Sequence, residues 1–385
     1  MSFEVLPSLL GSLPHGKQGF SMLPKYPNHL SLIKILRANK YHSFFIAGSP
    51  LYFDNQGAFM REQGTDFISY EFPEKYKKMD GENSWSYGYP DDAVFDFGIQ
   101  LIDTFQKSPY VKVYVTITTH PPYIFNQKNH YEKLFLERLN QQSLTESQKP
   151  DFLKLKETLS SFIYFDDVFR DFINRYKERS DYENTIFIVT GDHQGYYAPK
   201  NSLGKYHVPL IIFSPLLKKT QTFPALVSHR DVTPTIIQLL SERYNFDVPD
   251  VNHWLGKALD TFSTFRSHQK LPLLGWNKQP QNFVHGKHYY NGNEVFQITD
   301  SALNISPIKN DSIKDLLSKH LKRFIYLNNY VSYAHKIMPD SIHYQSDKFD
   351  HICLSEKKSE TILDTRKKYP LGVNFNTVKK FLLGK

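Results

Sequence analysis

The sequence predicts an α/β fold with a mostly parallel central sheet and helices on both faces, followed by a small α+β subdomain. Between residues 30 and 240, short apolar runs rich in β-branched residues alternate with helical patterns. This alternation favours parallel strands joined by helices that cover the sheet. After about residue 265 the pattern changes to a hairpin and one long helix. We therefore expect a main domain over 1–265 and a C-terminal subdomain over 266–385.

The individual elements follow from residue type and spacing. Strands are expected at 42–47, 111–117, 185–190 and 208–213, and helices at 30–38, 151–179 and 231–240. Pro234 fits the last of these helices, because proline is tolerated in a first helical turn. In the subdomain, 285–300 has the pattern of a hairpin that turns at Asn291-Gly292-Asn293, and 311–338 has that of an amphipathic helix. The remaining residues are polar and Lys-rich.

Charge and cysteine content narrow the classes of function. The net charge of +8 favours anionic partners such as phosphorylated substrates or anionic lipids, although a solvated Lys-rich surface explains it equally well. The sequence has neither zinc-finger spacing nor the aromatic signature of RNA-binding modules, so no nucleic-acid partner is expected. The single cysteine, Cys353, excludes an internal disulfide and thiolate-rich metal sites. No apolar run reaches the roughly 18 residues of a membrane span, and no signal-peptide pattern opens the chain.

The strongest chemical signal is the segment 190–195 (TGDHQG), which follows a predicted strand. Asp192 and His193 are adjacent there in a glycine-flanked turn, and sites in α/β proteins lie beyond the carboxyl ends of strands. A carboxylate and a neutral imidazole together suit one divalent ion such as Mn, Zn or Ca. The structural alternative is an Asp-capped turn beside an incidental histidine. On this motif alone both interpretations are open.

Three more histidines stand next to predicted elements. His120 follows a strand and shares an edge with Asp192 if the two strands are parallel; there it would hold a substrate oxygen or donate a proton to a leaving group. His207 precedes its strand and reaches that edge only if this strand is antiparallel to its neighbour. His229 precedes the helix 231–240 and faces the site from a loop. An ordinary structural role is the alternative for each.

Taken in chain order, these segments resemble the sulfatase group of the alkaline phosphatase superfamily, and within it the lipoteichoic acid synthase-like phosphoglycerol transferases. The resemblance is carried by 118–122 (TTHPP), 190–195 (TGDHQG), 207–212 (HVPLII) and 231–236 (DVTPTI). The segment 2–14 resembles the opening of the family's nucleophile helix. The likeness spans roughly residues 2–260, and the ordered set is much more specific than an Asp-His pair alone.

The resemblance implies chemical roles for individual residues. It implies that Ser2 is the nucleophile, bound to the metal and carrying the transferred group covalently, with Asp192 and His193 as further metal ligands. A metal-bound hydroxyl is a sensible nucleophile, because the metal lowers its pKa and neutralises charge on the transferred group. The resemblance also implies that His120 contacts the phosphate or the leaving oxygen of the substrate. Without the resemblance, Ser2 has the pattern of a helix N-cap.

The substrate-binding residues implied in the same way are Asp54, Asn55, His207 and His229. Asp54 and Asn55 lie in a stretch that lines the family's substrate pocket, and His207 matches a position often near the metal. Lipoteichoic acid synthases have Trp and Arg in this stretch, whereas this chain has Phe53 and Asn55. This departure argues against glycerol phosphate as the substrate.

The leading expectation is a metal-dependent transferase or hydrolase of phosphoesters or sulfoesters that transfers a phospho-head group from an anionic lipid to a glycan acceptor in the cell envelope. The segment 2–6 does not fit the Cys/Ser-x-Pro-x-Arg motif of sulfatases proper, so sulfate-ester hydrolysis is the less favoured option. The alternative from another class is a catalytically inactive, envelope-binding module that uses the basic C-terminal part.

A missing segment bears on the choice between these two. The family's catalytic domain begins with a strand that ends in an acidic metal ligand, and no counterpart precedes Ser2 in this sequence. A misassigned start, a fragment of a split gene and a degenerate copy each explain this. We expect weak or no activity from this exact chain. A longer product is expected to be active and membrane-associated, at the periplasmic or extracellular face of a bacterial membrane.

Overall fold

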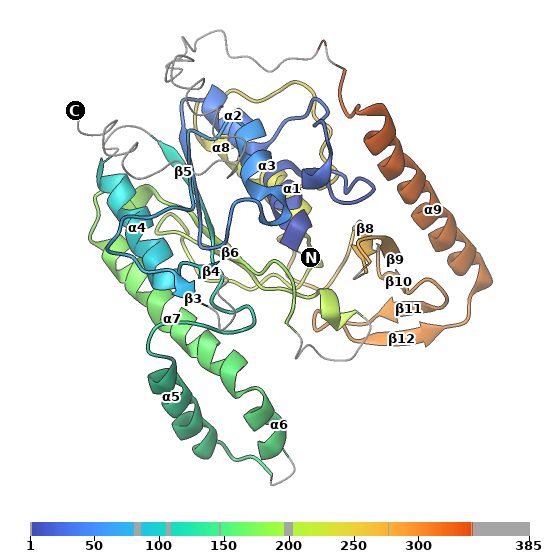
Figure 1. Cartoon of the computed structure of the whole chain (residues 1–385). Helices are drawn as coiled ribbons and strands as arrows, with labels where there is room; N and C mark the ends of the chain where they lie inside the picture. Colours follow the sequence, from blue (N-terminus) through green and yellow to red (C-terminus); the bar gives the residue numbers. More distant parts are fainter. Residues whose placement is uncertain are drawn as a thin grey trace. The chain divides into compact units, whose positions relative to one another are not determined.

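The computed structural model describes residues 2–80, 86–104, 109–145, 148–195, 203–275, 277–339 and 341. These residues belong to two compact units, which are described separately. Unit 1 comprises Met1–Tyr41, Asp54–Gly64 and Ile186–His351, and unit 2 comprises His42–Phe53, Thr65–Thr185 and Ile352–Lys385. Figure 1 labels the helices and strands of both. The division into domains 1–265 and 266–385 stays a prediction.

The first part of unit 1 consists of helices and one pair of short strands. Its elements are α1 (Ser2–Gly11), η1 (Phe20–Met22), α2 (Leu32–Ala38), η2 (Phe53–Asn55, whose first residue belongs to unit 2), α3 (Gln56–Glu62), β6 (Phe187–Thr190), η4 (Gly204–Tyr206), β7 (Leu210–Phe213), η5 (His229–Asp231) and α8 (Val232–Arg243). β6 and β7 pair antiparallel. α1 packs on η5 and α8, and the Thr233 hydroxyl donates a hydrogen bond of 2.7 Å to the Leu9 carbonyl. The N-terminal helix is thus fixed to the segment that carries His229.

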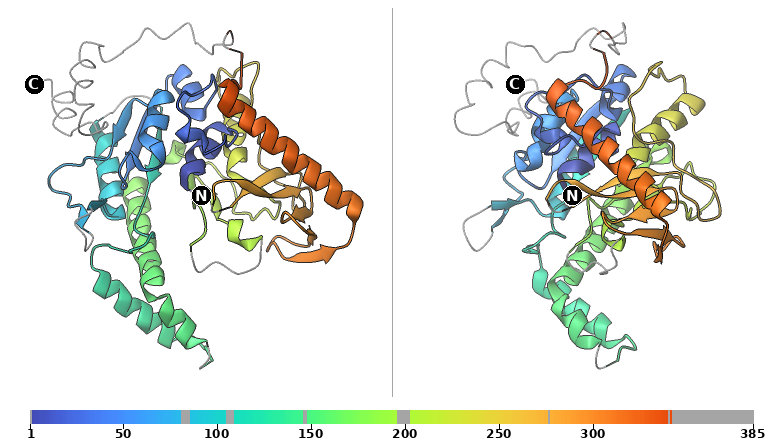
Figure 2. Two further views of the ribbon diagram at one scale, coloured as in Figure 1. Left: turned by 45° about the vertical axis from the view of Figure 1, so that its right-hand side comes forward. Right: turned by 90° about the vertical axis from the view of Figure 1, so that its right-hand side faces the viewer.

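A five-stranded antiparallel sheet and one long helix form the second part of unit 1 (Figures 1 and 2). The strand order is β12-β11-β10-β9-β8, with β8 (Lys270–Leu274), β9 (Pro280–His285), β10 (His288–Tyr290), β11 (Val295–Ile298) and β12 (Ile305–Ile308), and the helix is α9 (Asp311–Ala334). Successive side chains of a strand point to opposite faces. Phe283 and Tyr290 therefore pack with Leu317 of α9, while Val284 and Tyr289 belong to a second cluster. Both faces of this sheet are thereby buried.

Unit 2 contains the parallel sheet. β1 (His42–Ala47) lies between β2 (Phe67–Ser69) and β5 (Tyr110–Val115), and both neighbours run parallel to it. β1 is buried after its first residue, as expected for a continuous apolar strand paired on both edges. The remaining elements are β3 (Met79–Asp80), β4 (Ser86–Gly88), α4 (Asp91–Thr104), α5 (Lys128–Asn140), α6 (Lys149–Lys154), α7 (Lys156–Lys177) and η3 (Tyr182–Asn184). α7 packs against α4 and α5.

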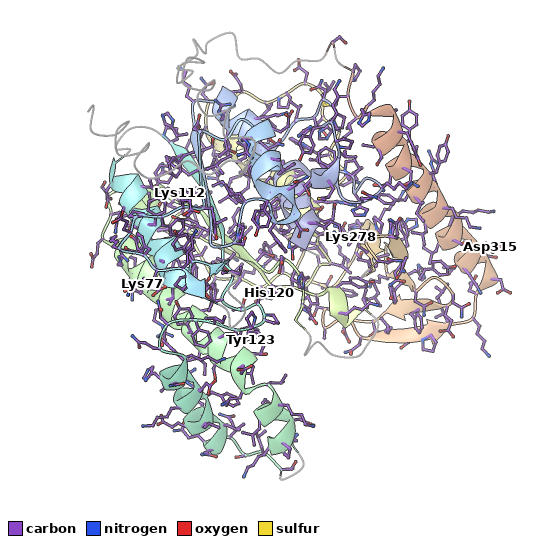
Figure 3. All side chains as sticks on the ribbon, in the orientation of Figure 1. Lys77, Lys112, His120, Tyr123, Lys278 and Asp315 are labelled. Carbon is purple, nitrogen blue, oxygen red and sulfur yellow. The ribbon has the colours of Figure 1, made fainter. Side chains whose placement is uncertain are left out.

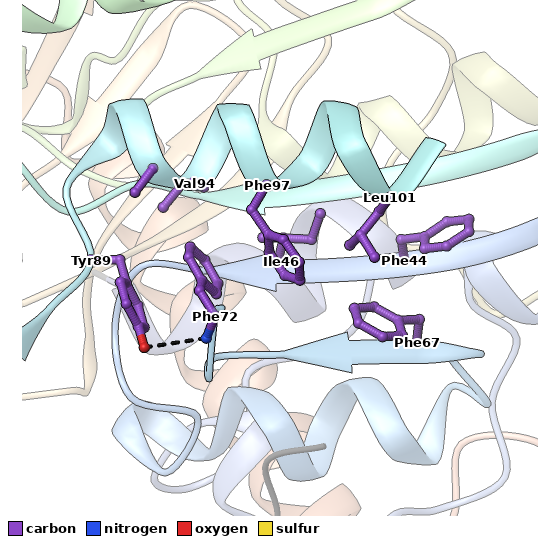
Figure 4. Close-up of a cluster of buried hydrophobic side chains, with 9 residues drawn as sticks. Phe44, Ile46, Phe67, Phe72, Tyr89, Val94, Phe97 and Leu101 are labelled. Carbon is purple, nitrogen blue, oxygen red and sulfur yellow. Dashed lines mark hydrogen bonds between the residues drawn. The ribbon is translucent and has the colours of Figure 1, made fainter. Parts of the chain in front are cut away.

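The core of unit 2 forms between the parallel sheet and α4 (Figure 4). The rings of Phe44 in β1 and Phe67 in β2 have centroids 6.1 Å apart, and Phe97 of α4 lies 4.6 Å from Phe72. Tyr89 stacks on Phe72 with centroids 4.1 Å apart, and its hydroxyl accepts a hydrogen bond of 3.2 Å from the Phe72 N–H. The stacked pair fixes the start of α4 against the sheet.

The structure confirms the α/β fold class and most of the predicted elements, with small shifts at their ends. β7 is antiparallel to β6, which is the arrangement that His207 needs to reach the end of β6. The predicted hairpin is present as β10 and β11. The sequence did not predict α4, α5 or the outer strands β8 and β12. The polar tail after residue 341, with Cys353, lies outside the described residues, and no described helix is long and apolar enough to cross a membrane.

Candidate active site

The loop after β6 carries two of the predicted metal ligands, Asp192 and His193. Its backbone lies next to the entry of β7, because a Cβ atom built on Gly191 would be 3.6 Å from the Cβ atom of Val208. His207 directly precedes Val208 and is exposed. The antiparallel pairing of β6 and β7 therefore places His207 at the same end of this strand pair as Asp192 and His193.

Hydrogen bonds within the loop orient Asp192 and His193. Asp192 Oδ1 accepts from the backbone N–H of His193 at 2.8 Å, and His193 Nδ1 lies 2.7 Å from the carbonyl oxygen of Gln194. Because a carbonyl oxygen only accepts, His193 donates this hydrogen bond from Nδ1, and Nε2 is the ring nitrogen left for other contacts. Nε2 is 3.5 Å from Asp192 Oδ2. Two electron-rich atoms so placed favour a cation or a proton close to both.

His229 of η5 lies against the end of β6. Its Nε2 is 3.0 Å from the Thr190 hydroxyl oxygen, which is also 2.7 Å from the Pro209 carbonyl. Burial lowers the pKa of His229, while a hydrogen bond to the backbone of Gly191 and the negative charge of Asp192 act in the opposite direction. Burial has the larger effect, so His229 presents a neutral imidazole next to Asp192 at neutral pH.

Asp54 and Asn55 lie where η2 leads into α3, and both have left-handed backbones, with φ of 48° and 56°. Such residues are strained by about 1 kcal/mol or more each and occur often at functional sites. Burial raises the pKa of Asp54; the positive charge of Lys278 lowers it, and the negative charges of Asp192 and Glu4 raise it further. The Asp54 carboxyl group is therefore close enough to Asp192 and Lys278 for their charges to act on it. Asn55 Nδ2 donates to the Ser21 carbonyl at 3.2 Å.

Ser2 is the first residue of α1, and the first turn of this helix is held by buried polar groups. Glu4 is 6% exposed, and its Oε1 accepts from the Phe20 N–H at 3.0 Å. The same oxygen lies 2.8 Å from Nδ1 of the fully buried His15, although off the line of a hydrogen bond. Since α1 also packs on η5, the Ser2 end of the helix belongs to the same part of unit 1 as His229.

His120 belongs to unit 2, whereas the other predicted site residues belong to unit 1; these are Ser2, Asp54, Asn55, Asp192, His193, His207 and His229. His120 is exposed in the turn after β5, where Figure 3 labels it with its neighbour Tyr123. Its Nδ1 is 2.6 Å from the Pro121 carbonyl oxygen. The predicted meeting of His120 with Asp192 stays a prediction.

The turn that carries His120 is held by a carboxylate that sequence reasoning missed, Asp91. This residue is fully buried at the start of α4, and its Oδ1 accepts from the backbone N–H groups of Ile117 at 2.9 Å and Thr118 at 3.1 Å. The Thr118 hydroxyl accepts from the Asp91 N–H at 3.2 Å. Burial raises the pKa of Asp91 to about 6, against the effect of these hydrogen bonds. Nothing in the sequence pattern marks Asp91, because its partners lie a strand away in the chain.

The described residues were tested against the predicted divalent metal. Asp192 and His193 match in kind, since a carboxylate oxygen and an imidazole lone pair suit Mn or Zn. They do not match in number, because the part of the chain that the structure describes holds no group of three or more His, Cys, Asp or Glu side chains arranged for a metal. The ligand roles of Ser2, Asp192 and His193 therefore stay predictions.

The described residues also line a hollow. It measures about 610 Å³, belongs to unit 2, and is lined among others by Asp92, Asp96, Asp171 and Arg175. None of the predicted site residues lines it. We therefore build the candidate site on the strand ends of unit 1 and not on this hollow.

Comparison with known proteins identifies relatives. A protein-family model described as Sulfatase matches residues 2–242. Lipoteichoic acid synthase 2 of Bacillus subtilis is 26% identical over 244 residues, which is 58% of this chain and 34% of that protein. Phosphoglycerol transferase I of Citrobacter koseri is 23% identical over 195 residues, 50% of this chain and 23% of that protein. The chain thus spans about a quarter to a third of the length of the curated relatives it matches.

Two crystal structures share the fold. One is a protein of the alkaline phosphatase superfamily from Vibrio parahaemolyticus, with a TM-score of 0.58 and 17% identity over 87% of this chain and 76% of that one. The other is a lipoteichoic acid synthase from Listeria monocytogenes, with a TM-score of 0.60 and 13% identity over 87% of this chain and 81% of that one. At these identities the likeness concerns the fold alone.

Proposed function

Because this chain belongs to the sulfatase family, whose model matches residues 2–242, we propose that it acts on a phosphoester or sulfoester through a hydroxyl nucleophile and one divalent metal. The family and the relatives place it in the class of sulfatase-like transferases and hydrolases. Transfer of a phospho-head group is the favoured reaction, since the curated relatives described above are a lipoteichoic acid synthase and a phosphoglycerol transferase.

The observation that carries this proposal is the arrangement at the end of β6. His193 Nε2 and the Asp192 carboxylate oxygen Oδ2 lie 3.5 Å apart. The neutral His229 is next to them, bridged to β6 through the Thr190 hydroxyl. A purely structural Asp-capped turn requires neither the closeness of these two atoms nor a second imidazole next to the carboxylate.

The proposed roles follow from this arrangement. Asp192 and His193 would hold the metal, which would lower the pKa of a hydroxyl group and offset negative charge on the substrate. Ser2 provides the attacking oxygen from the start of α1. His120 binds a substrate oxygen or protonates the leaving alcohol. The substrate is further held by polar side chains around the end of β6, namely Asp54, Asn55, His207 and His229.

The proposed substrate is the phosphate of an anionic head group, with a glycan as acceptor, at the periplasmic or extracellular face of a bacterial membrane. The net charge of +8 supports an anionic substrate or surface. The neutral amide of Asn55 supplies no positive charge in the stretch where the resemblance to lipoteichoic acid synthases implies an arginine, so glycerol phosphate is not the favoured head group. The metal is Mn, Zn or Ca.

A second candidate function is an inactive envelope-binding module. The observation that favours it is the absence, in the ranges that the structure covers, of a third acidic or imidazole ligand beside Asp192 and His193. Such a module would bind its anionic ligand without turning it over.

Mass spectrometry of residue 2 separates the two functions. The chain is incubated with a phosphodiester or sulfate ester and Mn, Zn or Ca, and the N-terminal peptide is searched for an added phosphoryl or sulfuryl group. In this step a bond forms from Ser2 Oγ to phosphorus or sulfur, the ester bond breaks, and the leaving alcohol takes a proton. Since weak activity is expected of this exact chain, we expect the adduct in a small fraction of the wild-type molecules and of Ser2→Thr, which keeps a hydroxyl, but not in Ser2→Ala or Asp192→Ala. A wild type without adduct under every metal supports the module.

A further inference from the structure

Lys278 occupies the turn between β8 and β9, at a position that sequence reasoning did not single out. The Gly275 N–H donates to the Gln279 carbonyl at 2.9 Å, and the Lys278 N–H donates to the Gly275 carbonyl at 3.1 Å. Lys278 itself has a left-handed backbone, with φ of 62°. This conformation is unfavourable for a residue with a Cβ atom, and it persists where the surroundings hold it. The conformation of this turn is therefore held at a cost in conformational free energy.

A chain of buried contacts ties this turn to the start of α1. His15 Nε2 is 2.7 Å from the Lys278 carbonyl oxygen and so donates to it. The other ring nitrogen of His15 lies 2.8 Å from Glu4 Oε1 in the first turn of α1. His15 is fully buried and Glu4 is 6% exposed, so both contacts are shielded from water. The position of Lys278 is thereby coupled to the helix that begins at Ser2.

The side chain of Lys278 runs back over the same helix. Its Nζ atom is 4.6 Å from the ring centroid of Phe3, the neighbour of Ser2 (Figure 3 labels Lys278). Its positive charge acts on the carboxyl group of Asp54, and the negative charge of Asp192 acts on the same group. Over the described ranges Lys278 forms no ion pair within 4.0 Å, although its charge acts on the carboxyl group of Asp54. Its ammonium group is thus held on an aromatic ring and not neutralised by direct contact.

Arg230, whose charge interacts with Glu4 of α1, is less suited to a ligand. Arg230 is 8% exposed and lies with its guanidinium 5.7 Å from the ring of Phe324, inside the unit. Asn55, on the other side of Asp54, is neutral. Of Lys278 and Arg230, Lys278 is therefore the side chain better placed to meet a negatively charged ligand at Ser2.

We infer that Lys278 binds the tetrahedral oxyanion of the substrate, a phosphate or sulfate ester, and that the Glu4–His15 pair positions its turn. The inference rests on the proposed function for the identity of the ligand. An ammonium group stacked on Phe3 and fixed through its backbone loses little freedom on binding an oxyanion, and charge-assisted hydrogen bonds of this kind are the strong ones. Lys278 thus supplies the charge that residue 55 does not.

The sheet offers a matched control for this inference. Lys287 lies in the next turn of the same sheet, between β9 and β10, with its Nζ 5.3 Å from the ring of Phe265. It shares the residue type, the hairpin position and the aromatic support of Lys278, but no contact links it to α1 among the described residues. Lys287→Met therefore removes an equivalent charge without touching the proposed site.

Calorimetric titration of inorganic phosphate and sulfate into the full chain tests the inference. We expect Lys278→Met to weaken binding about tenfold or more, in line with a lost charged hydrogen bond. Lys278→Arg is expected to retain most of the affinity, and Lys287→Met to bind as the wild type. Thermal unfolding of each variant confirms that it is folded. Equal affinity of Lys278→Met and wild type, or a wild type that binds neither anion, overturns the inference.

Two further experiments are needed. One identifies the source of the bound oxyanion, and the other tests this inference independently of the proposed function. Co-sedimentation with phosphatidylglycerol vesicles, against phosphatidylcholine vesicles, shows whether the phosphate bound through Lys278 belongs to a lipid head group or to a soluble ester. A wild type that binds phosphate through Lys278 but never forms the Ser2 adduct keeps this inference and removes the proposed function. If the Ser2 adduct forms equally well in Lys278→Met, and the phosphate affinity of this variant is unchanged, the proposed function is kept and this inference is removed.

Discussion

The loops after β5 and β6 both place a histidine just beyond a strand, yet they are built in opposite ways. After β5, the backbone is held by the buried Asp91, and His120 itself is exposed. After β6, the predicted site residues contact one another and their own backbone: Asp192 accepts a hydrogen bond from the His193 N–H, and the Thr190 hydroxyl contacts His229 Nε2. A histidine just after a strand therefore occurs in two kinds of loop. In unit 2 a buried carboxylate holds the loop, whereas in unit 1 the loop carries a partly exposed cluster of side chains. This difference predicts that stability depends on the first loop and ligand binding on the second.

The largest expected effect on stability is that of Asp91→Ala. The substitution leaves the buried N–H groups of Ile117 and Thr118 without their acceptor, and each such group costs about 1–3 kcal/mol. We expect the free energy of unfolding to fall by about 4 kcal/mol at pH 5, measured by urea denaturation. A loss below about 1 kcal/mol would show that the Asp91 contacts do not support this loop.

The pH dependence of stability is the next largest effect. Asp91 has a pKa of about 6 in the folded chain against 3.8 as its ordinary value, so the folded state holds the proton more tightly. The contribution of Asp91 to stability is therefore present below about pH 4 and falls as the pH rises to about 6, by up to about 3 kcal/mol. Asp91→Asn keeps an acceptor and removes the titration. The free energy of unfolding of Asp91→Asn should therefore lack this slope between about pH 4 and pH 6, which the wild type shows; identical slopes in the two proteins would contradict the assignment.

A smaller effect is expected from Thr190→Val in the loop after β6. It removes the hydroxyl that contacts His229 Nε2 and the Pro209 carbonyl, which costs about 1 kcal/mol. Thr190→Ser keeps the hydroxyl and should match the wild type. The imidazole resonances of His229 in NMR spectra report the change directly, and unchanged resonances in Thr190→Val would argue against the contact.

The smallest effect on stability is expected from Asp192→Ala. The Asp192 side chain is 44% exposed, and exposed substitutions change the free energy of unfolding by within about 0.5 kcal/mol. The result should be measured in the same urea series as Asp91→Ala. A large loss here would place Asp192 among the structural residues and reverse the contrast between the two loops.

Local signals account for what the sequence predicted. β-branched runs marked β1, β5, β6 and β7, and the Asn-Gly turn marked the hairpin of β10 and β11. The Asp192-His193 pair was found because both residues are neighbours in the chain. Their surroundings were not predictable in the same way, because they are formed by distant residues.

Lys278 shows why. Its carbonyl is held by His15, 263 positions earlier, and its charge reaches Asp54 on a third segment. No spacing rule connects these residues, since only the packing of α1 against the β8–β9 turn brings them together. Asp91 is a milder case, with partners 26 and 27 positions away across a helix and a strand. Reactive residues just after a strand can be recognised in a sequence, whereas the residues that hold them in place are brought together only by the tertiary fold.

The metal content of the purified chain tests the central claim most directly. The wild type, Asp192→Ala and Asp315→Ala, an exposed site on α9 that Figure 3 labels, are dialysed against Mn, Zn or Ca and analysed by mass spectrometry of the elements. The account predicts one equivalent of a divalent metal in the wild type and in Asp315→Ala, and none in Asp192→Ala. A wild type that retains no metal, or an Asp192→Ala variant that retains as much, would contradict it.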